Sequence, residues 1–218
     1  MAHVGLLGGT FNPPHLGHLV CAQEAWLQLG LDRVLLVPVH TPPHKEIDTD
    51  PGVEQRVALC RLAVVGDERL GVSRADADVP GRSYTVDTLS RLHEAFPGDE
   101  LTFIVGGDMA RSLPTWREPE AVVALAWFGV AEREGAARGE ILQSLSGIPG
   151  AVERTRFFAM PRIDISSTLI RRRVEEGRPV RYLVPEAVAD HIAREGLYGG
   201  PRAPGPAAGA TGRGEVPA

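Results

Sequence analysis

Two histidines spaced three residues apart stand directly behind a glycine-rich turn near the start of the chain. The stretch runs Gly8-Gly9-Thr10-Phe11-Asn12-Pro13-Pro14-His15-Leu16-Gly17-His18. Glycines let a backbone approach a ligand closely, and the first turn of a helix offers unpaired N–H groups at the positive end of its dipole. His15 and His18 would share one face of that turn, as cationic or proton-donating side chains aimed at one anion. The stretch therefore predicts a phosphate site.

A second group of polar residues, near the C-terminal end, could hold another part of the same ligand. Ser166, Ser167 and Thr168 are consecutive hydroxyl residues at a predicted helix start, and Arg171 follows one turn later. Hydroxyls, backbone N–H groups and a guanidinium can together bind an anion. Taken alone, the pattern is more typical of an ordinary capped helix with a solvated arginine. Two such helix starts in one chain nevertheless indicate a polyphosphate bound between them.

Three further positions are weaker candidates. His44 and Lys45 follow two prolines in a loop, and Lys45 is the only lysine among the 23 Lys and Arg residues. Asp108 follows two glycines at the end of a predicted strand, where a carboxylate often accepts ribose hydroxyls, although a turn-forming Asp is equally common there. Trp116 lies in a proline-bounded loop, where its ring could cover the core or stack on a flat ligand.

Zinc is the main alternative ligand for the two N-terminal histidines. Cys21, His40 and His44 are conceivable additional donors for a four-coordinate site. The glycine loop in front of the pair favours an anion instead, because exposed backbone N–H groups at a helix start attract negative charge.

The elements that must position these residues alternate between strands and helices. Strands are predicted at 4–7, 33–37, 70–73, 101–105, 127–131 and 156–159. Helices are predicted at 19–27, 53–65, 83–96, 119–125, 141–145, 165–176 and 185–195. This alternation predicts an α/β fold, a Rossmann-like doubly wound parallel sheet with helices on both faces in three layers. Ligands of such folds bind beyond the carboxyl ends of the strands, where the glycine loop lies.

Length and composition restrict the class of protein. The chain has 218 residues, 43% of them hydrophobic, which predicts one domain at 1–198, with a C-terminal helical part at about 165–198. Residues 199–218 are rich in Gly, Pro and Ala, and we expect a disordered tail. The net charge of −5 argues against nucleic-acid or membrane-surface partners. With no membrane-spanning run, no signal-peptide pattern and two cysteines whose spacing fits neither a disulfide framework nor a metal site, a cytoplasmic location is expected.

The two polar segments resemble the paired signatures of the nucleotidyltransferase superfamily, the first at residues 8–18 and the second at Ile165-Ser166-Ser167-Thr168-Leu169-Ile170-Arg171. Within that superfamily, three further segments resemble bacterial nicotinate-nucleotide adenylyltransferases: Pro42-Pro43-His44-Lys45, Ser83-Tyr84-Thr85, and Gly106-Gly107-Asp108 through Pro114-Thr115-Trp116. Each motif is only moderately specific, but five in the same order, over residues 4 to about 198, are strong evidence.

The resemblance implies a reaction of ATP with nicotinate mononucleotide that gives deamido-NAD and pyrophosphate, by direct in-line attack without a covalent enzyme intermediate. The catalytic residues would be His15, His18 and Arg171. ATP would be bound by Gly8, Gly9, Thr10, Phe11, His15, His18, Gly106, Asp108, Ser166, Ser167, Thr168 and Arg171. Mg²⁺ would be held by the ATP phosphates rather than by the protein, and a homo-oligomer is left open.

Nicotinate mononucleotide would be bound by His44, Lys45, Tyr84, Thr85 and Trp116. His44 and Lys45 would reach its phosphate. Tyr84 and Thr85 would line the pyridine pocket, and Trp116 would stack on the ring. No cation among these residues obviously pairs with the nicotinate carboxylate, so backbone donors would have to distinguish it from the amide of nicotinamide.

Three other interpretations compete with this one. A related adenylyl- or cytidylyltransferase could act on pantetheine phosphate or an alcohol phosphate, but the pantetheine-phosphate family usually has Thr at the position of His15. A relative of class I aminoacyl-tRNA synthetases would share the His-x-Gly-His element, and the acidic charge and short chain argue against it. A nucleotide sensor without activity is disfavoured because His15, His18 and Arg171 are all present.

Overall fold

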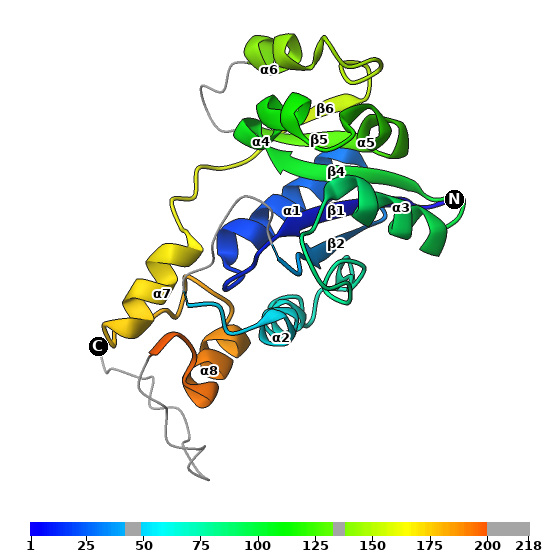
Figure 1. Ribbon diagram of the computed structural model, residues 1–218. Helices are drawn as coiled ribbons and strands as arrows, with labels where there is room; N and C mark the ends of the chain where they lie inside the picture. Colours follow the sequence, from blue (N-terminus) through cyan, green and yellow to red (C-terminus); the bar gives the residue numbers. More distant parts are fainter. Residues whose placement is uncertain (42–48, 133–137, 200–218) are drawn as a thin grey trace.

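A parallel sheet organises the chain in the computed structural model, which describes residues 1–41, 49–132 and 138–199. The strands lie in the order β3-β2-β1-β4-β5-β6, all parallel (Figure 1). Their bounds are β1 His3–Gly9, β2 Arg33–Pro38, β3 Leu70–Val72, β4 Glu100–Gly106, β5 Trp127–Glu132 and β6 Thr155–Ala159. The strand order reverses between β1 and β4, and in doubly wound sheets ligands bind at such a switch point, beyond the carboxyl ends of the strands. The predicted doubly wound α/β fold is confirmed.

The central strands form because their apolar residues are buried from both sides. In β2 all residues after Arg33 are buried, as expected of a parallel strand covered on both faces. In β1, a Cβ placed on Gly5 would lie 2.7 Å from a Leu31 methyl and 2.9 Å from a Val34 methyl. Only glycine lets β1 pack this closely against the next connection, so the strand that leads into the candidate site is firmly seated.

Helices cover the two faces of the sheet and produce the predicted three layers. Helices α1 (Leu16–Leu29) and α2 (Val53–Ala63) share one hydrophobic cluster with the sheet. The opposite cluster joins the sheet to α3 (Thr85–Ala95), α4 (Gly107–Ser112), α5 (Pro119–Leu125) and α6 (Arg138–Leu145). Each face of the sheet therefore has its own buried core (Figure 1).

The C-terminal elements pack on α2 rather than on the sheet. Helices α7 (Ser167–Glu175) and α8 (Glu186–Glu195), with the 3₁₀ turn η2 (Leu197–Gly199), enclose a third hydrophobic cluster with Leu59 and Ala63. The backbone N–H of Leu16 donates to the carbonyl of Leu183 at 3.0 Å, which ties this unit to the start of α1. The predicted helices at 165–176 and 185–195 are confirmed within about two residues at each end.

One segment differs from expectation. Gly106, Gly107 and Asp108 were expected only to end a strand, but the chain turns at once into α4 and then into the 3₁₀ turn η1 (Leu113–Thr115). Two glycines at a helix start lower helix propensity, so the local sequence conceals this helix. It forms because Ala110 and Leu113 are buried in the core under it. Tertiary packing overrides the local preference here.

The free edge of the sheet is protected by a side chain. Gln28 of α1 donates its amide N–H to the carbonyl of Ala159 at 2.8 Å, and its amide oxygen accepts from the Ala159 N–H at 2.9 Å. A side-chain amide thus pairs with the last residue of edge strand β6 as a neighbouring strand would.

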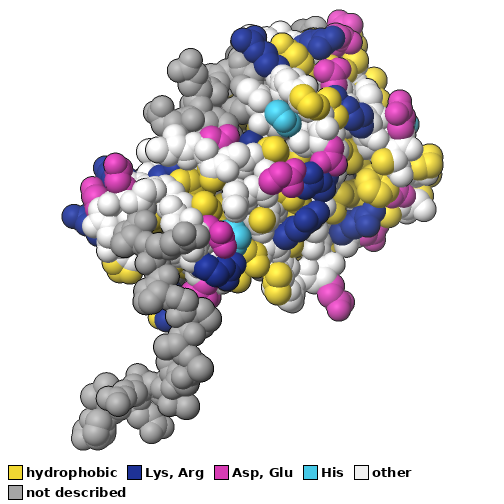
Figure 2. Space-filling view, turned by 60° about the horizontal axis from the view of Figure 1, so that its bottom comes forward, with side chains coloured by type: hydrophobic (Ala, Val, Ile, Leu, Met, Phe, Trp, Pro, Cys, Tyr) yellow, Lys and Arg dark blue, Asp and Glu magenta, His cyan; other side chains and the backbone are white. Residues whose placement is uncertain are grey.

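Surface and termini add little that bears on the site. On the face shown in Figure 2, basic and acidic side chains are interspersed among hydrophobic ones. Among the described residues, no helix is long and apolar enough to cross a membrane. Gly199, placed in the predicted tail, belongs to η2. The rest of that predicted tail, residues 200–218, lies outside the described residues.

Candidate active site

The glycine loop leaves the carboxyl end of β1 and leads into α1. A Cβ on Gly8 would lie 3.1 Å from the Phe103 ring, and one on Gly9 would lie 3.1 Å from the Phe11 ring. Phe11 itself has a φ of 50° and is buried under the loop. Both glycines therefore sit where a side chain would crowd an aromatic ring, and the backbone of the loop lies open above β1.

His15 and His18 form a stacked pair at the start of α1. His15 is the N-cap residue and His18 the third helical residue, and their ring centroids are 3.7 Å apart with an interplanar angle of 29°. The backbone N–H of His15 donates to Nδ1 of His18 at 3.1 Å. Since Nδ1 of His18 accepts, the proton of the neutral ring is on Nε2, which is free to donate to a ligand.

Burial decides the charge of the pair. Burial lowers the pKa of His15 to about 4. Burial also lowers the pKa of His18 to about 3, and repulsion from His15 adds to this decrease. These lowered pKa values favour neutral rings at pH 7 in the free protein, so of the two predicted states, cationic or proton-donating, they favour the second. The expectation of hydrogen-bond donors is compatible with this state, because a neutral imidazole still carries one N–H.

Polar atoms without partners surround the pair. Asn12 is 2% exposed, and neither its amide nitrogen nor its amide oxygen has a hydrogen-bond partner among the described residues. The Nδ1 atom of His15 also has none there. Buried polar groups are destabilising unless they are hydrogen-bonded, so this corner of the loop is suited to receive the polar atoms of a ligand.

The second predicted signature docks on the first. Ser166 caps α7, its Oγ accepting from the Leu169 N–H at 3.1 Å, as its position predicted. Ser167 Oγ donates to the carbonyl of Pro13 at 2.8 Å, and Arg171 Nη1 donates to the carbonyl of Asn12 at 2.9 Å. Two segments more than 150 residues apart in sequence thus meet at one loop. Thr168 is exposed beside them, 3.5 Å from Arg171 Nη2.

A fully buried arginine, Arg56 of α2, connects the glycine loop to the end of β2. Its guanidinium donates to the carbonyls of Thr10 (3.1 Å), Val39 (2.7 Å) and His40 (2.8 Å), and its Nε donates to Asp50 at 3.0 Å. The side chain is 1% exposed. Sequence reasoning missed this residue, although a charged residue on the apolar stripe of the 53–63 helix was a visible signal.

The residues predicted for the pyridine pocket lie at the start of α3 and at the end of η1. Trp116 donates its indole N–H to Ser112 Oγ at 2.9 Å, and its ring meets Phe103 edge-on with centroids 6.0 Å apart. Phe103 is the ring that crowds Gly8. Tyr84 is the N-cap residue of α3, and Thr85 is the first residue of that helix. The Phe103 ring therefore lies between Trp116 and Gly8 of the glycine loop and connects the two.

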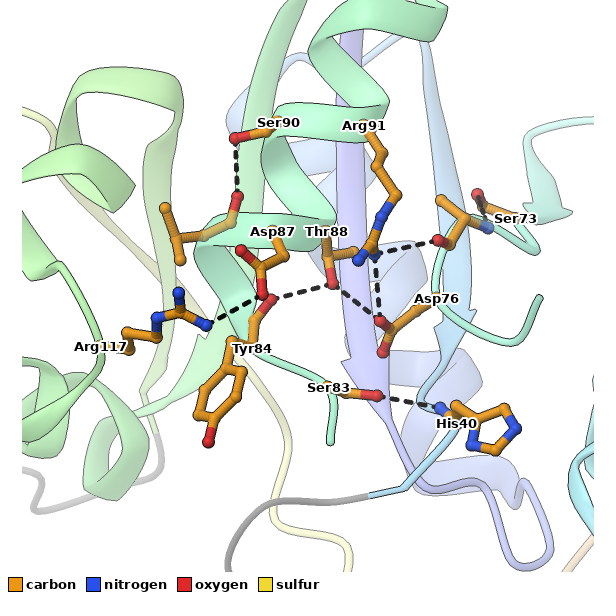
Figure 3. Close-up of polar contacts among 12 residues, drawn as sticks. His40, Ser73, Asp76, Ser83, Tyr84, Asp87, Thr88, Ser90, Arg91 and Arg117 are labelled. Carbon is orange, nitrogen blue, oxygen red and sulfur yellow. Dashed lines mark hydrogen bonds and ion pairs between the residues drawn. The ribbon is translucent and has the colours of Figure 1, made fainter. Parts of the chain in front are cut away.

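Tyr84 is positioned by contacts at both ends of its segment (Figure 3). Ser83 Oγ accepts from the His40 N–H at 3.0 Å, and the Ser83 N–H donates to the carbonyl of Thr41 at 2.9 Å. Further along α3, Thr88 donates to the buried carboxylate of Asp76 at 3.0 Å. Tyr84 therefore stands directly beside residues 40–41, which lead into the loop of His44 and Lys45. His44 and Lys45 themselves lie outside the described residues.

Asp108 is the second residue of α4, two residues after the exposed Gly106 at the end of β4. Its side chain is 93% exposed and forms an ion pair with Arg111. Exposure leaves the carboxylate accessible to a hydroxyl donor at the carboxyl end of the sheet. The predicted ribose contact remains a prediction.

A protein-bound metal finds no support among the residues that the structure describes. Within 1–41, 49–132 and 138–199, no group of three or more His, Cys, Asp or Glu side chains could hold a metal ion. His40, one conceivable zinc donor, has Nδ1 3.1 Å from Thr41 Oγ1. His44, another, lies outside the described residues.

Comparison with known proteins agrees with this arrangement. Residues 6–173 match the family described as cytidylyltransferase-like. The chain is 40% identical to a probable nicotinate-nucleotide adenylyltransferase of Thermomicrobium roseum, over 91% of this chain and 92% of that one. It is 45% identical to a protein of the same description from Thermus thermophilus, over 89% and 98%. Among solved structures it is similar to Plasmodium falciparum nicotinic acid mononucleotide adenylyltransferase complexed with NaAD, with a TM-score of 0.72 and 17% identity, covering 91% of this chain and 98% of that one.

Proposed function

We propose a function from one premise: the chain belongs to the nicotinate-nucleotide adenylyltransferases, within the cytidylyltransferase-like family. It transfers AMP from ATP to nicotinate mononucleotide and releases pyrophosphate, forming deamido-NAD. The relatives that carry this description match it along nearly their whole length. In the molecule, the observation that best supports this function is the docking of Ser167 and Arg171 on the loop that ends in the stacked histidines.

In the reaction, a phosphate oxygen of nicotinate mononucleotide attacks the α-phosphorus of ATP. A new P–O bond forms there, the bond from the α-phosphorus to the bridging oxygen of pyrophosphate breaks, and the electron pair leaves with pyrophosphate. A phosphate nucleophile needs no strong base, so catalysis consists of positioning and of stabilising the developing charge. The neutral rings of His15 and His18 suit this role, because Nε2–H of His18 can donate to a phosphoryl oxygen.

The remaining predicted residues divide between the two substrates. The loop at Gly8–Phe11 and the segment from Ser166 to Arg171 would hold the ATP phosphates, and Asp108 with Gly106 would hold the adenosine ribose. His44 and Lys45 would bind the mononucleotide phosphate, and Tyr84, Thr85 and Trp116 its pyridine ring. A divalent cation, which we propose is Mg²⁺, would enter with the triphosphate and screen its charge. We place the reaction in the cytoplasm, as the low cysteine content of the chain suggests.

The proposal is tested by pyrophosphate release with ATP and Mg²⁺. Nicotinate mononucleotide, nicotinamide mononucleotide and pantetheine phosphate are compared side by side, with EDTA as the metal-free control. We expect turnover with nicotinate mononucleotide and its loss on adding EDTA. Turnover of pantetheine phosphate with neither pyridine nucleotide accepted would show that the substrate is wrong. Equal use of the two pyridine nucleotides would leave the reaction type intact and contradict the substrate preference.

A further inference from the structure

Arg117 is the residue that follows Trp116, and its guanidinium lies beside Tyr84, the other aromatic residue predicted to line the pyridine pocket. Its Cζ lies 4.9 Å from the centroid of the Tyr84 ring (Figure 3). The side chain is 50% exposed. A guanidinium is therefore present beside Tyr84 and next in sequence to Trp116, in a region where sequence reasoning found no cation.

The guanidinium is only loosely paired. Its Nη1 lies 3.4 Å from Asp87 Oδ2, and its Nε lies 3.3 Å from Glu118 Oε1. Both contacts are long, single-point and partly exposed, and ion pairs of that kind contribute little to stability. Since a guanidinium carries five N–H donors, most of those of Arg117 remain available to a ligand.

Two other arginines, Arg91 and Arg111, also have acidic partners. Arg91 lies 3.5 Å from the buried carboxylate of Asp76 and donates to the carbonyl of Ala75. Arg111 forms an ion pair with Asp108 and lies 3.6 Å from Glu140. Arg117 differs from both because its guanidinium also lies over an aromatic ring of the predicted pocket.

We propose that Arg117 binds the carboxylate of the nicotinate ring and so determines the preference for nicotinate over nicotinamide mononucleotide. This inference rests on the proposed function, because it concerns the pyridine side of the same site. A planar guanidinium forms two parallel hydrogen bonds to a carboxylate, and these charge-assisted bonds are about twice as strong as neutral ones. The neutral amide of nicotinamide has one acceptor oxygen instead of two and no negative charge, so it cannot form this charge-assisted pair of bonds.

Substitution of Asp87 tests in which direction the substrate preference changes. In the free protein the Asp87 carboxylate lies at Nη1 of Arg117, so it would compete with the substrate carboxylate for that donor. Arg117→Gln and Asp87→Asn both break the same ion pair, so a purely structural role would change the substrate preference equally in both variants. Recognition of the carboxylate predicts different effects, a decrease in Arg117→Gln and no decrease in Asp87→Asn, because one variant removes the cation and the other frees it.

The experiment compares kcat/KM for the two mononucleotides in each variant of the full chain. We expect Arg117→Gln to lower the ratio of nicotinate to nicotinamide by about tenfold or more, which a charge-assisted pair of this kind can supply. Arg117→Lys retains the positive charge but cannot form the two parallel hydrogen bonds of a guanidinium, so its ratio should lie between those of Arg117→Gln and the wild type. Asp87→Asn should leave the ratio unchanged or raise it. Arg156→Gln is the matched control. The guanidinium of Arg156, in β6, also lies over an aromatic ring, 4.7 Å from the centroid of Trp127 at the start of β5.

The outcomes separate the two proposals. An unchanged ratio in Arg117→Gln, or the same decrease in Arg117→Gln and Asp87→Asn, would overturn the role of Arg117 while leaving the reaction intact. If the wild-type protein turns over neither pyridine nucleotide, the proposed function fails. Calorimetric titration with each mononucleotide then still tests Arg117: a preference for nicotinate that is lost in Arg117→Gln supports the contact, and equal wild-type affinities overturn it.

Discussion

The two sides of the candidate site are built in different ways. On the histidine side, Arg56, Arg171 and Ser167 donate to backbone carbonyls of the glycine loop, and Arg56 is fully buried. On the pyridine side, Tyr84 and Trp116 are half-buried, and the neighbouring Arg117 is bound only by long, exposed ion pairs. The first arrangement fixes the path of a backbone. The second leaves side chains adjustable, which suits a region that must discriminate between similar ligands.

Removing Arg56 is the most severe test of this contrast. Arg56→Met should lower the free energy of unfolding by about 3–5 kcal/mol, because three carbonyls and Asp50 lose a buried cationic partner. Urea denaturation measures the change, and Arg61→Met, on the exposed face of the same helix, is the control. A change below about 1 kcal/mol (the range of an exposed pair) would show that the loop does not depend on this side chain.

The next largest effect is expected on catalysis. His18→Ala removes the Nε2–H donor and should lower kcat by about 10²–10³, the range found for losing one positioned donor. Steady-state kinetics and a thermal melt of the same sample separate lost activity from lost folding. His93→Ala, an exposed histidine on α3, controls for the substitution itself. A decrease smaller than roughly threefold would refute the assigned role.

The predictability of the two sides differs for the same physical reason. Gly8, Gly9, His15 and His18 could be assigned from spacing because a strand, a turn and a helix start are local patterns, and these appear in the structure as expected. The meeting of Arg171 with Asn12 and the burial of Arg56 depend on contacts between distant segments. Spacing alone carries no information about such contacts.

The pyridine side was less accessible to sequence reasoning. Helix α4 was hidden by its two glycines, and Arg117 was passed over because nothing local distinguishes it from the many other arginines. Its significance comes from the Tyr84 ring, more than thirty residues away in sequence. Fold class and strand positions, by contrast, followed from hydrophobic alternation because burial on both faces of a sheet leaves continuous apolar runs.

The pH dependence of stability tests the histidine side in a different way. The folded pKa of His15, about 4, lies below its unfolded value of 6.5, so the unfolded chain takes up the proton first as the pH falls. Stability is therefore lost as the pH decreases from about 6.5 towards 4. Between pH 7 and 5.5, we expect His15→Gln to remove about 1 kcal/mol of this loss in urea titrations.

Two checks accompany that measurement. The carboxyl groups of Glu54, Asp67 and Asp78 have lowered pKa values through their arginine partners, and their contributions are lost only in more acidic solution, below their ordinary values. His191 also has a pKa lowered by burial. His191→Gln therefore shows how much of the pH dependence of the free energy of unfolding comes from this second histidine. An identical slope in wild type and His15→Gln would contradict the assignment.

The smallest effect is expected where the pyridine side is loosest. Arg117→Gln should change the free energy of unfolding by less than about 1 kcal/mol, because its ion pairs with Asp87 and Glu118 are exposed. Urea denaturation beside Arg56→Met provides the contrast on one scale. If Arg117→Gln lowered the free energy of unfolding as much as Arg56→Met, the two sides of the site would not differ in how firmly their side chains are held.

The amide of Gln28 stands where the backbone of a further strand would lie. It satisfies both outward-facing backbone groups of Ala159, and its nitrogen also donates to Glu24 of the same helix at 2.8 Å. A strand from a second copy would have to displace this side chain before it could pair at that end of β6. The molecule therefore carries its own protection against edge-to-edge polymerisation there, and copies that associate would do so through other surfaces.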